Sequence, residues 1–299
     1  GQTGKTTMIE QLLLAAGILA KAEPIESGKT VSDYTPEEIE RKISIYATLV
    51  HLPWKDININ FWDTPGSSDF LGEVITAFRT SELALMMMHA KAGIQIETVK
   101  LWRQLDRRNK PRVVFVNHLD DEHASFSNCI HELRTQFEVE ACPVTIPIGS
   151  GAAYRGIIDV LHGKAWLTDG SGETEAEIPA EFRDEYERAR EILAGAAAEG
   201  DDELLVKFID EAGLSDDDIK RGLELAIKDN RIVPVFAGCA KKGSGIKSVL
   251  DFIAEIMPPP SGALEVALDK DGNEVAVKIN PAQPLSALVV KTTNDQFSG

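Results

Sequence analysis

The chain has 299 residues, of which 43% are hydrophobic and 26% are charged, and its formal net charge is −17 at pH 7. This balance is typical of a soluble globular protein with one large domain or two ordinary ones, and no apolar run approaches the length of a membrane span. The acidity excludes a protein that holds nucleic acid by bulk electrostatics, because phosphate contacts require clustered lysine and arginine.

Strands and helices alternate along the chain. Each predicted strand is an alternating or a continuous apolar run, and these strands cover residues 57–63, 83–88, 113–116 and 232–237. The predicted helices cover residues 6–20, 98–108, 179–198 and 202–212. Residues 24–42 are polar and predict a loop that contains a short helix. The alternation predicts an α/β fold, with a mostly parallel sheet and helices on both of its faces.

Three polar loops directly follow predicted strands. They are residues 63–66 (DTPG), 117–120 (NHLD) and 238–241 (GCAK). In parallel sheets, ligands bind outside the carboxyl ends of the strands. We therefore expect the three loops to form one ligand site at one edge of the sheet.

The ligand class is indicated by residues 1–7 (GQTGKTT), which open a predicted helix. They match the second half of a phosphate-binding loop, GxxxxGK[ST], whose first glycine and preceding strand we expect upstream of residue 1. Gly4 lets the backbone approach the phosphates, Lys5 supplies a cation near them, and the Thr6 hydroxyl can ligate Mg²⁺. The expected nucleotide-binding residues of this loop are Gln2, Thr3, Gly4, Lys5, Thr6 and Thr7.

The order of the motifs resembles that of translational GTPases of the elongation factor G type. GKTT is followed by RKISI at residues 41–45, DTPGSSDF at residues 63–70 and NHLD at residues 117–120. TVKLWRQ at residues 98–104 and GIIDV at residues 156–160 are similar to stretches of elongation factor G and its ribosome-protection relatives. The resemblance implies a P-loop NTPase G domain with an inserted α/β subdomain, followed by the first strand of a β-barrel.

The resemblance also implies domain boundaries. Residues 1–142 would form the core of the G domain, without its first strand and the start of the phosphate loop. Residues 143–230 would form the inserted subdomain, and residues 231–262 the end of the G domain. Residues 263–299 would be a linker and the truncated start of domain II, with an opening strand from residue 284 onward.

Roles at the phosphate end follow from the same resemblance. Lys5 and Thr6 would bind phosphates and Mg²⁺, and Ser44 would ligate the metal from the first switch segment. Asp63 would hold Mg²⁺ through water, and the Gly66 N–H would sense the γ phosphate. The implied cofactors are GTP or GDP and Mg²⁺.

Roles at the base end fall on the other two loops. Asn117 and Asp120 would read guanine, with Asp120 accepting hydrogen bonds from the N1 and N2 hydrogens. Cys239 and Ala240 would occupy the last base-contacting loop. An ATP-using P-loop enzyme remains an alternative, but a carboxylate facing adenine would meet a lone pair where guanine offers a donor.

Two motif positions depart from the family pattern. Ser67 stands where the family has a histidine that orients the attacking water, and losing a positioned imidazole typically costs about 10²–10⁴ in rate. His118 replaces the lysine of NKxD, whose stem packs along the base. Both changes are compatible with drift in an active lineage or with a damaged gene. Two functions stay open: GTP hydrolysis coupled to ribosomal translocation, or a ribosome-binding factor that uses GTP as a conformational switch with weak or no hydrolysis.

Acidic residues are concentrated in one region. Residues 166–229 hold 20 acidic and 7 basic side chains, which predicts either a solvated helical surface or a docking face for a basic partner. In relatives, a helix of the inserted subdomain contacts the basic stalk protein of the large ribosomal subunit, and Glu185, Glu187 and Glu191 lie near that position. The expected partner is therefore the ribosome, through its stalk and GTPase-activating centre. We expect a cytoplasmic monomer without sequence-specific nucleic-acid binding or membrane contact.

Cysteine and histidine are scattered. Cys129, Cys142 and Cys239 are odd in number and lack CxxC spacing, so we expect neither disulfides nor a zinc site, as in a reducing cytosol. The six histidines are equally dispersed, and none lies four residues from another. We therefore expect no metal site built from these residue types.

Overall fold

The computed structural model describes residues 2–169, 172–210, 213–257, 259–260, 264–280 and 282–292. The chain up to Ile256 forms one compact unit, and a second unit begins at Met257. None of the helices in these described ranges is both long and apolar enough to cross a lipid bilayer.

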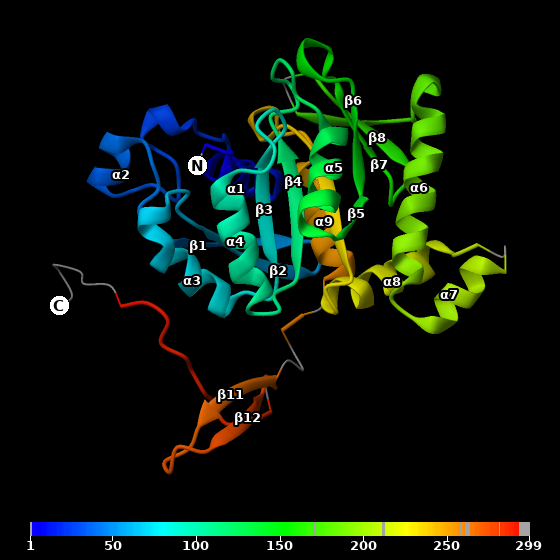
Figure 1. The fold of residues 1–299 in the computed structure, drawn as a ribbon. Helices are drawn as coiled ribbons and strands as arrows, with labels where there is room; N and C mark the ends of the chain where they lie inside the picture. The colour runs from blue at the N-terminus through cyan, green and yellow to red at the C-terminus, as the bar shows by residue number, and fades with distance from the viewer. Residues whose placement is uncertain are drawn as a thin grey trace. The chain divides into compact units, whose positions relative to one another are not determined.

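The first unit contains most of the secondary structure (Figure 1). Its helices are α1 (Lys5–Ala15), α2 (Pro36–Arg41), α3 (Leu71–Thr80), α4 (Ile96–Asp106), α5 (Phe126–Phe137), α6 (Arg183–Ala198), α7 (Asp202–Ile209), α8 (Asp216–Lys228) and α9 (Ile246–Ile256). Its strands are β1 (Thr48–Trp54), β2 (Ile57–Asp63), β3 (Ala84–His89), β4 (Arg112–Asn117), β5 (Glu140–Pro143), β6 (Thr145–Ile148), β7 (Gly156–Asp159), β8 (Lys164–Thr168), β9 (Glu173–Ala176) and β10 (Ile232–Ala237).

A four-stranded parallel sheet forms the centre of this unit. Its strand order is β3-β4-β10-β5. Helices α4 and α5 cover one face of the sheet and α9 covers the other (Figure 1). Every residue of β4 and β10 is buried, as their continuous apolar runs predict, whereas β3 is only partly covered. The predicted α/β fold with a mostly parallel sheet is confirmed.

Strands β1 and β2 form a separate antiparallel hairpin, in register from Thr48↔Asp63 to Trp54↔Ile57. Only Lys55 and Asp56 connect them, which is too short for a parallel crossover and suits a hairpin turn. Within the described residues, no ladder joins this hairpin to the central sheet. The prediction that the DTPG loop follows a strand of the same sheet as the other two loops is therefore wrong.

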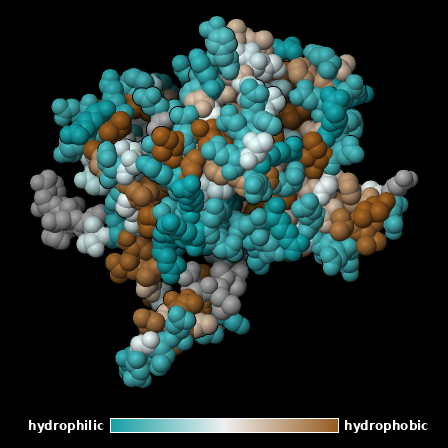
Figure 2. All heavy atoms as spheres, in the orientation of Figure 1, coloured by the Kyte–Doolittle hydropathy of each residue, from teal (hydrophilic) through white to brown (hydrophobic). Residues whose placement is uncertain are grey.

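The region between β5 and β10 adds a second four-stranded sheet, antiparallel throughout, with strand order β6-β7-β8-β9. Helices α6, α7 and α8 follow it. Ser215 and Asp218 form a capping box that starts α8. On α7, Leu205, Val206 and Ile209 are exposed and form an apolar patch (Figure 2). The expected helix end at Ala212 lies outside the described residues.

The second unit contains an antiparallel hairpin of β11 (Leu264–Leu268) and β12 (Glu274–Lys278). This hairpin has no counterpart in the sequence predictions. Residues 284–292 form neither helix nor strand, so the expected strand is not seen among them.

Candidate nucleotide-binding site

The segment before α1, which the sequence predicts to bind phosphates, ends in a left-handed turn at the start of the helix. Gly4 has φ 83° at the N-cap position, and a Cβ atom there would lie 2.5 Å from Nδ2 of Asn117. Glycine is therefore required both for the backbone conformation and for the close approach of the two loops. Gln2 before it is exposed and has φ 59°, and Thr7 behind it is half-buried.

Three hydroxyl groups and one carboxylate meet beside this turn. Thr6 Oγ1 donates a hydrogen bond to Asp63 Oδ2 at 2.8 Å and lies 3.2 Å from Ser44 Oγ. Ser32 donates to the same carboxylate oxygen at 2.6 Å. The three residues expected to hold a metal thus lie together, although they come from α1, the loop after α2 and the end of β2.

The electrostatics of this cluster favour a hard cation. Burial raises the pKa of Asp63, and it raises the pKa of Asp33 to about 6. Burial lowers the pKa of Lys5, against the opposing charges of Asp63 and Asp33. Asp63 Oδ1 and Asp33 Oδ1 are buried and have no hydrogen-bond partner among the described residues. Buried carboxylate oxygens without a partner, next to hydroxyl groups, suit Mg²⁺, which prefers oxygen ligands.

Glu38 positions the segment that carries Ser44. It is fully buried, forms a capping box with Thr35, and accepts hydrogen bonds from the N–H groups of Ile45 and Tyr46 at 3.0 and 3.1 Å. Sequence reasoning missed this role, although the TPEE pattern at residues 35–38 is a capping-box signal.

Sequence reasoning also missed Ser32 and Asp33. They lie in a polar loop without periodicity, and no local pattern marks them.

Asn117 contacts two other segments of the site. Its Nδ2 donates to the carbonyl oxygen of Thr3 at 2.9 Å, and its Oδ1 accepts from the N–H of Ala240 at 2.8 Å. The last residue of β4 thereby joins the segment before α1 to the loop after β10. The expectation that the loops after residues 117 and 237 lie together is met, because β4 and β10 are neighbouring parallel strands.

Asp120 is held as an ionised acceptor. Cys239 Sγ donates to its Oδ1 at 3.0 Å, and Lys242 Nζ lies 3.3 Å from its Oδ2. Burial alone would raise the pKa of Asp120, but Cys239 and Lys242 outweigh burial and lower it. Burial raises the pKa of Cys239 to about 12, so its thiol stays a neutral donor.

His118 adopts φ 63° and stacks on His89, with ring centroids 4.5 Å apart and planes at 14°. Burial and the neighbouring His89 lower the pKa of His118. The histidines are dispersed in the sequence, as noted above, but two of them meet in the structure. His89 ends β3 and is in register with Asn117 at the end of β4, so neighbouring strands bring two distant histidines together.

Ser67 and Gly66 lie on the segment after β2. Ser67 Oγ donates to Asp69 Oδ2 at 3.0 Å and accepts from the Asp69 N–H at 3.3 Å, which caps the 3₁₀ turn Ser68–Phe70. The Ser67 hydroxyl is therefore engaged within its own turn. Gly66 is half-buried beside it.

The three glutamates expected to contact a partner do not belong to this site. Glu185, Glu187 and Glu191 lie exposed on α6, in the region inserted between β5 and β10.

Comparisons with known proteins agree with this geometry. Residues 2–259 match the family described as the elongation factor Tu GTP binding domain. The chain is 35% identical over 298 residues to an elongation factor G-like protein of Thermotoga maritima, and 37% identical over 304 residues to an elongation factor G of Thermotoga petrophila. A solved structure from Thermus thermophilus matches with a TM-score of 0.81 at 29% identity, and the match covers 92% of this chain and 43% of that one.

The two Thermotoga alignments cover 99% of this chain but only 42% and 43% of the relatives. This chain therefore spans less than half the length of these relatives. The family match, in contrast, extends over most of its residues. The chain belongs to the elongation factor Tu GTP-binding domain family.

Proposed function

We propose that this chain is the GTP-binding part of an elongation factor G-like protein that couples GTP hydrolysis to ribosomal translocation. The observation that carries the proposal is the Asn117 side chain, which hydrogen-bonds both the phosphate segment at Thr3 and the base-end loop at Ala240. This one side chain sets the position of the base end of the site relative to the phosphate end.

Base recognition would depend on Asp120. An ionised carboxylate accepts two hydrogen bonds from the N1 and N2 hydrogens of guanine, whereas adenine offers no donor at N1. The S–H of Cys239 and the charge of Lys242 keep Asp120 ionised. The site would therefore select GTP and GDP over ATP.

Phosphate binding would depend on Lys5 and on the backbone N–H groups at the start of α1, with Gln2, Thr3, Gly4 and Thr7 lining the loop. Thr6, Ser44 and, through water, Asp63 would hold Mg²⁺, which supplies charge neutralisation at the phosphates.

The same cluster would act as a switch. Ser44 and Asp63 belong to separate segments that meet at Thr6, and the Gly66 N–H would bind the γ phosphate. Loss of that phosphate would remove the contacts that order both segments.

A second function is favoured by Ser67. Its hydroxyl is bound to Asp69 within the 3₁₀ turn, and the described site offers no imidazole at this position to orient water. A ribosome-binding factor that uses GTP as a conformational switch, with weak or no hydrolysis, would need only differential binding of GTP and GDP.

The proposed partner is the ribosome, at its GTPase-activating centre and its large-subunit stalk protein. The exposed Glu185, Glu187 and Glu191 would contact the stalk protein. We propose that the protein acts in the cytoplasm as a monomer, and that this part makes no sequence-specific contact with nucleic acid.

The test is GTP turnover by the natural protein, with and without ribosomes, comparing Ser67 with Ser67→His and measuring mant-GTP and mant-ATP binding in parallel. Ribosome-stimulated turnover by the unmodified protein supports the translocation function. Tight GTP binding without turnover, with turnover restored by Ser67→His, supports the switch function instead. Equal affinity for GTP and ATP would overturn both.

A further inference from the structure

Two histidines and an aspartate converge behind the base-reading loop. His89 and His118 stack at the ends of β3 and β4. The Asp121 N–H donates to the carbonyl oxygen of His118 at 3.1 Å, and this tight turn brings the Asp121 carboxylate back toward the rings. As a result, His89 Nε2 lies 3.4 Å from Asp121 Oδ2.

The spacing of these groups is close to that of metal ligands. The three residues each offer one ligand atom within 4.8 Å of the other two. In a tetrahedral site with metal–ligand distances of about 2.1 Å, neighbouring ligand atoms lie ~3.4 Å apart. The His89–Asp121 pair already has that separation. Because each nitrogen lone pair lies in the plane of its own ring, one imidazole would turn out of the stack when both histidines bind the same ion.

One nitrogen of the cluster also lacks a partner. His118 Nε2 is buried and has no hydrogen-bond partner among the described residues. Buried polar atoms are normally satisfied, so an orphan nitrogen in a cluster of ligand-type side chains indicates a missing partner.

We propose that His89, His118 and Asp121 bind a divalent transition-metal ion of the zinc class. Two imidazoles with one carboxylate favour Zn²⁺, Co²⁺, Ni²⁺ or Cu²⁺, whereas Mg²⁺ and Ca²⁺ prefer all-oxygen sites. The fourth position would be taken by water. This site is distinct from the oxygen cluster of Thr6, Ser44 and Asp63.

Metal binding has a cost at His89. The Lys91 N–H donates to His89 Nδ1 at 3.2 Å, which favours the neutral tautomer with its proton on Nε2. Ligation through Nε2 requires the other neutral tautomer, so the proton moves from Nε2 to Nδ1 and the Lys91 hydrogen bond is lost.

The proposed metal site lies beside the predicted nucleotide-binding residues. His118 lies between Asn117 and Asp120, and its Nε2 lies 3.5 Å from where a Cβ on Gly4 would stand. A metal tied to the end of β3 would hold this loop in the conformation that nucleotide binding requires. It would therefore raise affinity for GDP, and GDP would raise metal affinity by the same factor. This second step rests on the proposed function.

The test uses Co²⁺, titrated into the metal-free natural protein and followed by visible absorption and calorimetry. We expect one ion per chain, an absorption band of a four-coordinate nitrogen–oxygen site, and displacement by Zn²⁺ but not by Mg²⁺. His89→Asn and His118→Ala should each remove the band, and Asp121→Asn should weaken binding at least about tenfold. His131→Ala, at an exposed histidine on α5, should bind as the unmodified protein does.

Folding and nucleotide binding are measured separately. Circular dichroism reports on folding of each variant, and mant-GDP affinity is measured in EDTA and in Zn²⁺. Zinc should tighten GDP binding by the unmodified protein and leave His89→Asn unaffected. No Co²⁺ band in the unmodified protein, or a band that survives in folded His89→Asn, overturns the site. Loss of mant-GDP binding under every condition refutes the proposed function and leaves the Co²⁺ result standing by itself.

Discussion

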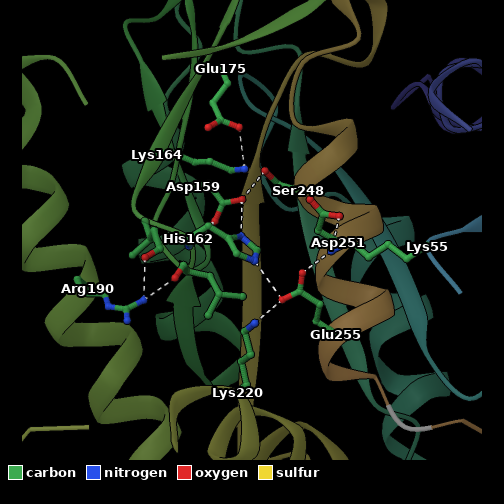
Figure 3. A network of polar contacts seen from close by, with 12 residues as sticks. Lys55, Asp159, His162, Lys164, Glu175, Arg190, Lys220, Ser248, Asp251 and Glu255 are labelled. Atoms are coloured by element: carbon green, nitrogen blue, oxygen red, sulfur yellow. Dashed lines mark hydrogen bonds and ion pairs between the residues drawn. The ribbon is translucent and has the colours of Figure 1, made fainter. Parts of the chain in front are cut away.

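His162 Nε2 lies 3.1 Å from Glu255 Oε2, and this contact joins the segment after β7 to the end of α9 (Figure 3). On the other side of the ring, Nδ1 lies 3.0 Å from Asp159 Oδ2. Glu255 also pairs with Lys220 of α8 and with Lys55 at the turn of the β1–β2 hairpin. His162 therefore links the inserted region to α9. Through Lys55, α9 in turn contacts the turn of the β1–β2 hairpin, which precedes the DTPG loop.

His162 predicts a pH dependence of stability. The carboxylates of Asp159 and Glu255 raise the pKa of His162 above its usual 6.5. Its stabilising contribution is therefore fully present below about pH 6.5 and is lost as the pH rises through the raised pKa of the folded state. We expect His162→Gln to lower the free energy of unfolding by about 1.5 kcal/mol at pH 6, near the lower limit for a hydrogen bond to a charged group because the ring is partly solvated.

Urea denaturation across the pH range measures this difference. The difference in unfolding free energy between the unmodified protein and His162→Gln should become smaller as the pH rises through the raised pKa of His162. His51→Gln is the matched control, because His51 is an exposed histidine on β1, and its effect should be small at every pH. A difference for His162→Gln that does not change with pH would show that packing, and not the charge of the ring, stabilises this contact.

Gly4→Ala tests whether a side chain at this position collides with Asn117 in addition to straining the backbone. At φ 83°, alanine costs roughly 1–2 kcal/mol, and its Cβ would lie 2.5 Å from Asn117 Nδ2. We expect the variant to displace Asn117, to lose about 2–4 kcal/mol of stability and to bind GTP at least about tenfold more weakly.

Gly17→Ala is the control for Gly4→Ala. Gly17 has φ 74°, but a Cβ there would meet nothing within 4 Å, so it should show the strain cost alone and leave GTP binding unchanged. Calorimetric unfolding and mant-GTP titration measure both effects. If the two variants lost the same amount of stability and Gly4→Ala still bound GTP normally, a collision between the Cβ of residue 4 and Asn117 would be contradicted.

The central sheet was predictable because its strands are buried. The run at residues 232–237 coincides with β10, since a parallel strand covered on both faces needs continuous apolar residues. The helix predicted to reach residue 20 ends at Ala15, with Gly17 in the left-handed region just beyond it. The β11–β12 hairpin was missed although its sequence carries a signal: Leu264, Val266 and Leu268 alternate along one run, Val275 and Val277 along the other, and Asp271-Gly272 lies between the two runs.

The meeting of the loops after β4 and β10 followed from topology, whereas the position of Ser44 beside Thr6 and Asp63 was expected only from the resemblance. Neighbouring parallel strands bring Asn117 and Cys239 together by a general rule. In contrast, Ser32 and Asp33 reach Asp63 through the path of a loop, which no local pattern specifies. The stacking of His89 on His118 depends on the register of two strands, and sequence spacing alone hides it.

Asp120→Asn tests how the base would be read. An amide at this position offers a donor where guanine also has donors, so each mispaired hydrogen bond should cost about 1.5–3 kcal/mol and GTP affinity should fall at least about tenfold. Xanthosine triphosphate has a carbonyl in place of the guanine amino group and should bind the variant better than the unmodified protein. Competition against mant-GDP measures both ligands.

Cys239→Ala is the control for Asp120→Asn. It removes the S–H donor to Asp120 and leaves the carboxylate in place, so GTP affinity should fall by less than about tenfold and xanthosine triphosphate should gain nothing. If Asp120→Asn gained no affinity for xanthosine triphosphate while remaining folded, Asp120 would not be the group that reads the base.

The acidic face of α6 predicts an effect on association rate. Glu185, Glu187 and Glu191 are exposed on this helix, and exposed charges mainly steer encounter with a partner of opposite sign. Replacing all three by glutamine should slow ribosome association about threefold to tenfold at low salt. The dissociation rate should stay the same, and the difference should disappear at high salt because the charges are then screened. Stopped-flow mixing with ribosomes at several salt concentrations measures these rates.

The matched control replaces three exposed glutamates outside the inserted region, Glu26, Glu82 and Glu138, and changes the net charge by the same amount. If α6 is a docking face, only the first triple variant slows association. If both variants slow it equally, the overall charge of the protein governs encounter and α6 is an ordinary solvated helix. A change confined to the dissociation rate of the α6 variant would instead indicate that these carboxylates are buried against the partner, because desolvated pairs act on dissociation.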